Sequence, residues 1–187
     1  MILCVGGSTT LGVRSTRGYP EHIAQQLGGV LVANRGIAGG RLVDVLRQLP
    51  SDLLLVGGPA VLLVGLPLHD AQGGGTPPSE LGVLLGQVVQ WGTAHCSQVV
   101  LCTPTPIGAA PLAPVRGFVR ASRRWVAKGA QEVRDVAAEY DLPVVAWDDM
   151  PPERLVDVAH PGPAGYRWMA DRALPVVQQA LEAIKGG

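Results

Sequence analysis

Short apolar runs alternate along the chain with longer segments in which apolar residues recur at helical spacing. Such alternation predicts a parallel β-sheet with helices on both of its faces. We expect five strands, the first directly after Met1 and the others at residues 30–33, 60–65, 98–102 and 142–146. The third run, Ala60–Gly65, is typical of a central strand that is buried on both faces. The predicted fold class is therefore α/β, with three layers in the order helices, sheet, helices.

The same pattern predicts the helices between these strands. They are expected at residues 19–27, 42–49, 81–94 and 115–137 and, after Pro163, to about residue 184. Ser79 is positioned to cap the third helix, because a serine oxygen can accept a hydrogen bond from the first turn. The helix at 115–137 is expected to be the longest, and Pro175 is expected to kink the last one. The connection at 66–78 is rich in Gly and Pro, and a loop of that length is usually functional or mobile.

Bulk composition narrows the possible roles. A chain of 187 residues is expected to form a single domain, 1–187, with a full hydrophobic core. Its 15 Lys and Arg balance 15 Asp and Glu, so no overall field attracts nucleic acid or an anionic membrane. No apolar run is long enough to span a bilayer and Met1 leads straight into a strand, so we expect a soluble cytoplasmic protein. The three cysteines lack metal-ligand spacing and are interpreted as reduced core residues. Neither a metal nor an organic cofactor is implied by the sequence.

Candidate chemistry begins where the first strand ends. The strand breaks at Gly6 and Gly7 and presents Ser8, which Thr9 and Thr10 follow. In an open α/β sheet, ligands bind at the carboxyl ends of the strands, so Ser8 lies where chemistry is expected. A serine is a poor nucleophile at neutral pH, and it needs a base within hydrogen-bond reach that a third group orients.

One histidine fits the role of that base. Of the four histidines, only His160 follows the last strand with a carboxylate, Asp157, three positions before it. One turn of irregular chain can fold Asp157 onto Nδ1 of the imidazole, which leaves Nε2 free to take the Ser8 proton. Two alternatives stay open. The first is that Asp157 pairs with Arg154 at the surface instead of with His160. The second concerns Arg14, which follows the turn that carries Ser8 and either lies in a solvated loop or meets an acidic acyl group.

Taken together, these segments resemble a known family. Residues 6–10 (Gly-Gly-Ser-Thr-Thr) resemble the first block of the SGNH or GDSL-type serine esterases and lipases. Residues 34–39 (Asn-Arg-Gly-Ile-Ala-Gly) resemble the second block, and residues 157–160 (Asp-Val-Ala-His) resemble the last. The resemblance implies a five-stranded parallel sheet in the flavodoxin-like order 2-1-3-4-5, which agrees with the alternation of strands and helices.

The resemblance also assigns roles to residues. Ser8 would be the nucleophile, and Asp157 and His160 would complete its catalytic triad. The backbone N–H groups of Ser8 and Gly36 would bind the oxyanion, with Asn34 in the same substrate-binding block. For Asn34 and Gly36, the structural alternative is a turn that requires a positive φ angle.

Two positions depart from the family pattern. Gly7 replaces the usual Asp before the serine, and the third block, Gly-x-Asn-Asp in the family, reads Gly65-Leu-Pro-Leu-His-Asp70 here. Pro67 offers neither a side-chain donor nor an N–H, and loss of one oxyanion donor typically costs about 2.7–4 kcal/mol in the transition state. We hypothesise that His69, in the same loop, supplies the missing donor.

The favoured function is hydrolysis of a small acyl ester through an acyl-serine intermediate. A first alternative is an acyltransferase or thioesterase of a biosynthetic pathway, whose altered third block directs the acyl group to another acceptor. An acyl carrier protein or coenzyme A would then be the partner. A basic stripe on the longest predicted helix could dock either of them, and it comprises Arg116, Arg120, Arg123, Arg124 and Lys128. A second alternative is a catalytically idle protein that binds a small ligand in the same pocket.

Overall fold

The computed structural model describes residues 1–71, 76–108 and 116–186. Its centre is a five-stranded parallel sheet with the order β2-β1-β3-β4-β5, which confirms the predicted order. The strands are β1 (Ile2–Gly6), β2 (Val32–Gly36), β3 (Val61–Gly65), β4 (Gln98–Cys102) and β5 (Val144–Val145). Because all neighbouring strands pair in parallel, their carboxyl ends meet at one edge of the sheet.

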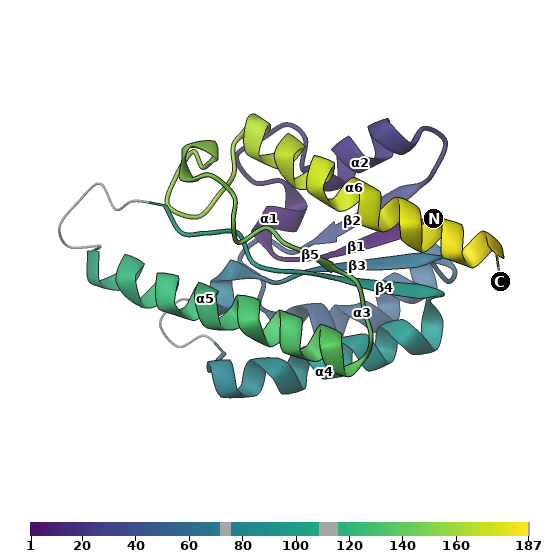
Figure 1. Ribbon diagram of the computed structural model, residues 1–187, viewed down its shortest axis with the longest axis horizontal. Coiled ribbons are helices and arrows are strands. Elements are labelled where there is room, and N and C mark those ends of the chain that lie inside the picture. The colour runs from purple at the N-terminus through teal and green to yellow at the C-terminus, as the bar shows by residue number, and fades with distance from the viewer. Residues whose placement is uncertain (72–75, 109–115, 187) are drawn as a thin grey trace.

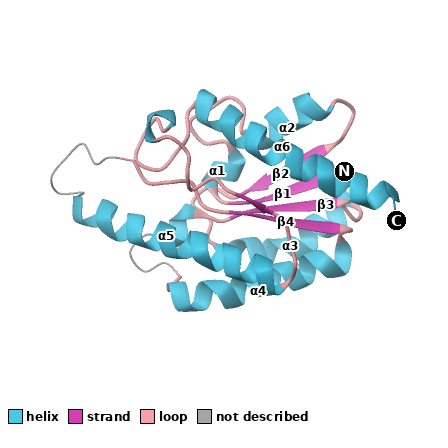
Figure 2. Ribbon diagram, in the orientation of Figure 1, coloured by secondary structure: helices cyan, strands magenta, loops and turns pink. Residues whose placement is uncertain are grey.

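Helices cover both faces of this sheet and complete the predicted three-layer α/β/α architecture (Figure 1). One face carries α2 (Tyr19–Leu27) and α6 (Pro163–Gly186). The other carries α3 (Leu42–Val56), α4 (Pro78–His95) and α5 (Arg116–Glu139). Figure 2 shows the strands enclosed between the two helical layers. Strands β1 and β3 are buried along their whole length, whereas the edge strand β2 is only partly buried.

The core is divided by the sheet, because successive residues of a strand face opposite layers. In β1, Leu3 packs with α3, α4 and α5, whereas Cys4 packs with α2 and α6. All three cysteines are free; Cys4 and Cys102 are fully buried and Cys96 is partly buried. Burial raises the pKa of Cys96 to about 11, so its thiol is protonated at neutral pH. The interpretation of the cysteines as reduced residues agrees with these positions.

Helix α3 is longer than predicted. It continues to Val56 instead of ending at residue 49, although Pro50 lies within it. Buried residues keep their helical spacing across the proline, with Leu49 before it and Leu53 after it. Burial of this apolar stripe outweighs the one backbone hydrogen bond that a proline removes.

Two strands also have different bounds from those predicted. Strand β2 begins at Val32 and runs through the polar residues Asn34 and Arg35 to Gly36, in register with β1. An edge strand has a partner on one side only, so it can carry polar side chains that a central strand excludes. Strand β5, at the opposite edge, retains only two of the five predicted residues.

The remaining helices follow the prediction with small corrections. The prediction that Ser79 caps α4 was wrong, because the helix already begins at Pro78 and Ser79 lies in its first turn. A proline suits that first position, since its missing N–H would have no acceptor there. Helices α5 and α6 are equally long, at 24 residues each, and α6 passes through Pro175. No helix among the described residues is long and apolar enough to cross a membrane.

Candidate active site

Ser8 opens a short helix at the carboxyl end of β1. The strand ends at Gly6, where φ is 155°, and α1 (Ser8–Leu11) begins two residues later. A side chain at Gly6 would overlap Thr10 Oγ1, so only glycine permits this turn. The turn therefore places Ser8 at the edge of the sheet where ligands of α/β proteins bind.

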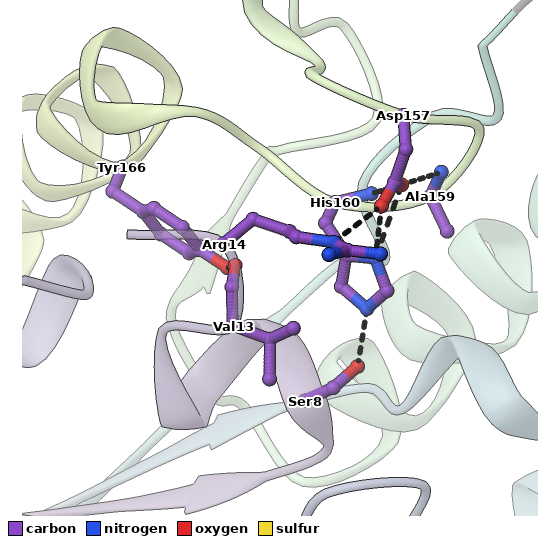
Figure 3. A network of polar contacts seen from close by, with 7 residues as sticks. All are labelled: Ser8, Val13, Arg14, Asp157, Ala159, His160 and Tyr166. Atoms are coloured by element: carbon purple, nitrogen blue, oxygen red, sulfur yellow. Dashed lines mark hydrogen bonds and ion pairs between the residues drawn. The ribbon is translucent and has the colours of Figure 1, made fainter. Parts of the chain in front are cut away.

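Three side chains from opposite ends of the sequence meet at this edge (Figure 3). Ser8 Oγ lies 3.1 Å from Nε2 of His160, and Nδ1 of the same ring lies 3.0 Å from each carboxylate oxygen of Asp157. An N–H at Nδ1 that donates to Asp157 leaves the Nε2 lone pair to accept the Ser8 hydroxyl proton. The structure thus brings together three residues that the sequence analysis grouped, although Ser8 and His160 are 152 positions apart.

Backbone hydrogen bonds hold the Asp157 carboxylate in place. Its Oδ1 accepts the N–H groups of Ala159 and His160, each at 2.8 Å. Partial burial raises the pKa of Asp157, but these two bonds, together with the hydrogen bond and charge of His160, outweigh it and lower the pKa to about 2. Asp157 is therefore ionised at neutral pH and can stabilise a protonated imidazole.

The loop that carries Asp157 and His160, residues 155–161, has an internal hydrogen bond and a second one to the segment after β4. Val156 N–H donates to the His160 carbonyl at 2.9 Å. Gly108, in the segment after β4, donates its N–H to the Val158 carbonyl at 2.8 Å. These bonds fix the loop beside the carboxyl end of β4.

Asp157 also has an ion-pair partner that the sequence analysis missed. Nε of Arg14, in the segment after α1, lies 3.1 Å from Asp157 Oδ2. The alternative pair between Asp157 and Arg154 is not formed in the described structure, where Arg154 donates to the Ala164 carbonyl instead. Arg14 does lie in an exposed loop, with its side chain 64% exposed, but it also forms the ion pair with Asp157. No pattern in the sequence links two residues 143 positions apart, and the only hint was a cation soon after the nucleophile turn.

The second block lies beside α1, and its polar groups bond to each other. Gly36 N–H donates to Asn34 Oδ1 at 3.1 Å, and Asn34 Nδ2 donates to Glu21 at 2.9 Å. The N–H that the family resemblance assigns to the oxyanion is therefore already bonded. Gly36 has no positive φ angle, so that alternative was wrong for this residue. Glycine is required because a side chain there would overlap the backbone of Leu11.

In the third block, Pro67 packs against the nucleophile turn. Pro67 is buried, and a Cβ added to Gly7 would lie 3.1 Å from Pro67 Cβ. That separation is tighter than ordinary van der Waals contact between carbon atoms. The two departures from the family pattern thus face each other in space, and a larger residue at position 7 would crowd the proline.

The end of the third block supports helix α3. Asp70 is buried; its Oδ2 accepts the Leu42 N–H at 2.8 Å, and its other oxygen accepts the Thr76 hydroxyl. Burial raises the pKa of Asp70, although the bonds from Thr76 and Leu42 act against the rise. His69 lies beside it in the 3-10 turn Leu68–Ala71. Within the described residues no hydrogen bond joins His69 to Ser8, and its role as an oxyanion donor stays a hypothesis.

The predicted basic stripe is only partly described. The side chains of Arg116 and Arg120 lie outside the described residues. Arg123 donates to the carbonyls of Ile107 and Gly108, at 3.1 and 2.9 Å, so its guanidinium braces the segment after β4. The other two members of the stripe are exposed.

Other polar features lie away from Ser8. A cavity of about 570 Å³ between α4 and α5 is lined partly by Glu132, Asp135 and Glu139, and none of the triad candidates lines it. Across residues 1–71, 76–108 and 116–186, no three His, Cys, Asp or Glu side chains are grouped so that they could hold a metal ion.

Comparison with solved structures identifies the fold. A carbohydrate acetylesterase family member from Sinorhizobium meliloti has a TM-score of 0.84 and 18% identity, over 97% of this chain and 98% of that chain. Axe2, an acetylxylan esterase from Geobacillus stearothermophilus, has a TM-score of 0.75 and 20% identity, over 94% and 93%. The native aryl esterase of M. smegmatis has a TM-score of 0.81 and 18% identity, over 96% and 98%. All three share the architecture described above.

One protein family matches most of the chain. Comparison with curated proteins finds no match. Residues 4–168 match the GDSL-like lipase/acylhydrolase family. This span includes Ser8, Asp157 and His160, and it contains the whole sheet except the first two residues of β1. The chain therefore belongs to the GDSL-like lipase/acylhydrolase family and is an enzyme of this group of SGNH hydrolases.

Proposed function

We propose that this enzyme hydrolyses acyl esters through an acyl-serine intermediate, with Ser8, His160 and Asp157 as its catalytic triad. The observation that carries the proposal is the chain of contacts from the Ser8 hydroxyl through the His160 ring to the Asp157 carboxylate, in which each contact is 3.1 Å or shorter. These are the distances at which a base can take a proton from a nucleophile and a third group can orient that base.

The proposed reaction has two halves. Ser8 Oγ attacks the ester carbonyl carbon while His160 Nε2 takes the hydroxyl proton, and the ionised Asp157 stabilises the resulting imidazolium. The tetrahedral intermediate then expels the alcohol, which receives the proton from His160 and leaves the acyl group on Ser8. A water molecule repeats these steps, releases the acid and restores Ser8. General-base assistance of this kind contributes about 10²–10⁴-fold to the rate.

The charge that develops on the carbonyl oxygen needs N–H donors near Ser8. The Ser8 N–H is the first proposed donor, because the first N–H groups of a helix have no acceptor within that helix. The Gly36 N–H is the second, and it can serve only after exchanging Asn34 Oδ1 for the substrate oxygen. Pro67 contributes no donor, so we expect a modest rate with simple esters unless His69 moves toward the site.

A small acyl group, first of all acetyl, is the proposed substrate class. Two proteins with the same fold are named as a carbohydrate acetylesterase family member and an acetylxylan esterase, and a third as an aryl esterase. Acetylated carbohydrates and aryl acetates are therefore the substrates to test first.

The test measures hydrolysis of 4-nitrophenyl acetate, butyrate and octanoate and of acetylated xylo-oligosaccharides. We expect the acetyl esters to react fastest and Ser8→Ala to abolish turnover. Ser51→Ala is the control, because among the described residues the Ser51 hydroxyl bonds only to Gln48, within helix α3. Undiminished turnover in Ser8→Ala would exclude Ser8 as the nucleophile. Absence of turnover with every ester in the wild type would favour the idle ligand-binding alternative.

Acyl transfer is a second candidate, and the position of Pro67 favours it. A site with one oxyanion donor fewer hydrolyses simple esters slowly, and a bound acceptor better placed than water would compensate for part of that loss. Product analysis separates the two functions. Hydrolysis predicts the free acid as the main product in the presence of added alcohols, amines or thiols, whereas transfer predicts the acyl group on one of these acceptors.

A further inference from the structure

The segment after α1 connects the nucleophile to the acid by a second route (Figure 3). Val13 N–H donates to the Ser8 carbonyl at 3.1 Å, and the next residue, Arg14, reaches Asp157 through its Nε. Together with the two bonds of His160, these contacts close a ring that starts and ends at Ser8. In such a ring each member has a contact on two sides. The positions of His160 and Asp157 relative to Ser8 are therefore fixed by more than one hydrogen bond each.

The backbone of this segment is held in a conformation that few side chains adopt. Arg14 has a φ of 73°, in the left-handed region where non-glycine residues are uncommon. The Tyr166 hydroxyl, from α6, donates to the Val13 carbonyl at 2.7 Å and anchors the segment. Tyr166 itself is fully buried, so this anchor is rigid. Strained residues of this kind persist only where their surroundings enforce them, and they cluster at functional sites.

Arg14 occupies one oxygen of the Asp157 carboxylate and leaves the other to the backbone. Its Nε donates to Oδ2, whereas the N–H groups of Ala159 and His160 both go to Oδ1. A rotation of the carboxylate about its Cβ–Cγ bond would weaken bonds on both sides. The plane of the carboxylate therefore stays turned toward Nδ1 of His160.

Arg14 also places a positive charge beside the relay. A cation near the imidazole opposes its protonation, both directly and by sharing the charge of Asp157. In the described part of the chain, the other ionisable side chain bonded to this ring of contacts is Tyr166, whose hydroxyl donates to the Val13 carbonyl and whose pKa is raised by burial. Because the Arg14 side chain is 64% exposed, solvent screens its charge and the effect is limited.

We propose that Arg14 is a positioning residue: it acts through Asp157, fixes the plane of the carboxylate and keeps His160 ready to accept the Ser8 proton. The inference rests on the proposed function for the catalytic effect. The contact on which it is built can be tested without turnover.

The test compares Arg14→Gln with Arg17→Gln. Arg17 lies in the same segment and donates to Gln25, so its loss removes the same charge without touching Asp157. With 4-nitrophenyl acetate from pH 5 to 9, Arg14→Gln should lower kcat by about 3- to 10-fold with KM nearly unchanged. The acidic limb of its kcat/KM profile should shift to higher pH by about 0.5 unit, a shift of the size expected when an exposed ion pair is lost. Arg17→Gln should match the wild type.

A spectroscopic signal tests the contact independently of the reaction. The Nδ1–H proton of a histidine bonded to a carboxylate gives a separate downfield NMR signal, which His160→Gln identifies by its loss. This signal should broaden or shift in Arg14→Gln and persist in Arg17→Gln. Arg14→Lys, which keeps the charge without the planar donor, should retain the acidic limb and lose part of kcat.

The outcomes separate the inference from the proposed function. If Arg14→Gln and Arg17→Gln share the wild-type kcat, pH profile and NMR signal, Arg14 is not a positioning residue, even where Ser8→Ala is inactive. A loss confined to KM for negatively charged acyl esters would also overturn the proposal, because Arg14 would then bind substrate. If Ser8→Ala retains turnover while the NMR signal depends on Arg14, the proposed function fails and the positioning contact stands.

Discussion

The two sides of Ser8 are built differently. On one side, which we call the relay side, His160 bonds to both Ser8 and Asp157. Asp157 also bonds to Arg14 and to the backbone of its own loop. On the opposite side, of the groups that the family resemblance assigns to the oxyanion, only the Ser8 N–H is available in the described part of the chain, because the Gly36 N–H is already bonded and the asparagine of the third block is missing. The Gly36 N–H donates to Asn34 Oδ1, and the third block has Pro67, which has no donor, where the family has an asparagine. Under the proposed function, the difference means that the contacts needed to activate Ser8 are complete, whereas those needed to stabilise the oxyanion are not.

Loss of the base is expected to have the largest effect. His160→Gln should lower kcat by about 10⁴–10⁶-fold, because the members of a triad act as a unit. Steady-state kinetics with an aryl acetate measures the loss. His95→Gln is the control, since His95 stacks on Trp91 at the end of α4, away from Ser8. A loss below tenfold in His160→Gln would mean that the relay side does not carry the chemistry.

Loss of the acid comes next. Asp157→Asn keeps the shape of the side chain but favours the wrong imidazole tautomer, and we expect kcat to fall by about 10³–10⁴-fold. The N–H groups of Ala159 and His160 keep an oxygen acceptor in this variant, so the loop should stay folded. The measurement is kcat alongside a thermal melt. A nearly active variant would show that His160 is oriented by the loop alone.

Much of this contrast could be predicted from the sequence, and the reasons are physical. Asp157 and His160 are close in the chain and follow the last strand, so a short loop was enough to join them. The position of Ser8 followed from the rule that parallel strands end at one edge. Arg14 could not be found, because its contact depends on how the segment after α1 folds back across the site.

The second block shows the same limit. Its sequence predicted a site residue at Gly36, but not that Asn34 would accept the N–H of Gly36. That contact depends on the register of β2, which pairs with β1 through residues that looked too polar for a strand. Likewise, α3 runs through Pro50 because burial of its apolar stripe outweighs a local rule.

A donor restored on the side of Ser8 opposite the relay side should increase activity. Pro67→Asn returns a side-chain donor to the third block, and we expect kcat for aryl acetates to rise by about tenfold. The gain should fall short of the full value of about 2.7–4 kcal/mol, because the site is not packed around an asparagine. Leu31→Asn, at an exposed position just before β2, is the control for an added amide. An unchanged or lower kcat in a folded Pro67→Asn variant would show that another group already donates a hydrogen bond to the oxyanion.

The bond between Asn34 and Gly36 gives a smaller effect. Asn34→Ala removes the acceptor of Gly36 N–H and the donor to Glu21, so stability should fall by about 1 kcal/mol. Activity should stay within about threefold of the wild type, because the freed N–H can still bind the oxyanion. Chemical unfolding and kcat are the measurements. A loss of activity above 100-fold would make Asn34 a direct part of the site.

The stability of the fold should also depend on pH through Asp157. The pKa of Asp157 is lowered to about 2, below its value in an unfolded chain, so its ionised form stabilises the fold above about pH 4. That contribution is lost as pH falls from 4 toward 2. Because the side chain is 32% exposed, we expect about 1–2 kcal/mol, measured as the stability difference between wild type and Asp157→Asn at pH 6 and pH 2. A difference that does not change with pH would contradict the carboxylate interactions described here.

In the proposed mechanism, the Ser8 hydroxyl is activated by a histidine from the other end of the chain. Mass spectrometry after treatment with a fluorophosphonate tests it most directly, because the reagent reacts with an activated serine and the adduct can be located in a peptide. We expect one adduct, on Ser8, which is lost in His160→Gln and retained in His95→Gln. An adduct on another residue, or labelling of Ser8 that is equally fast without His160, would contradict it.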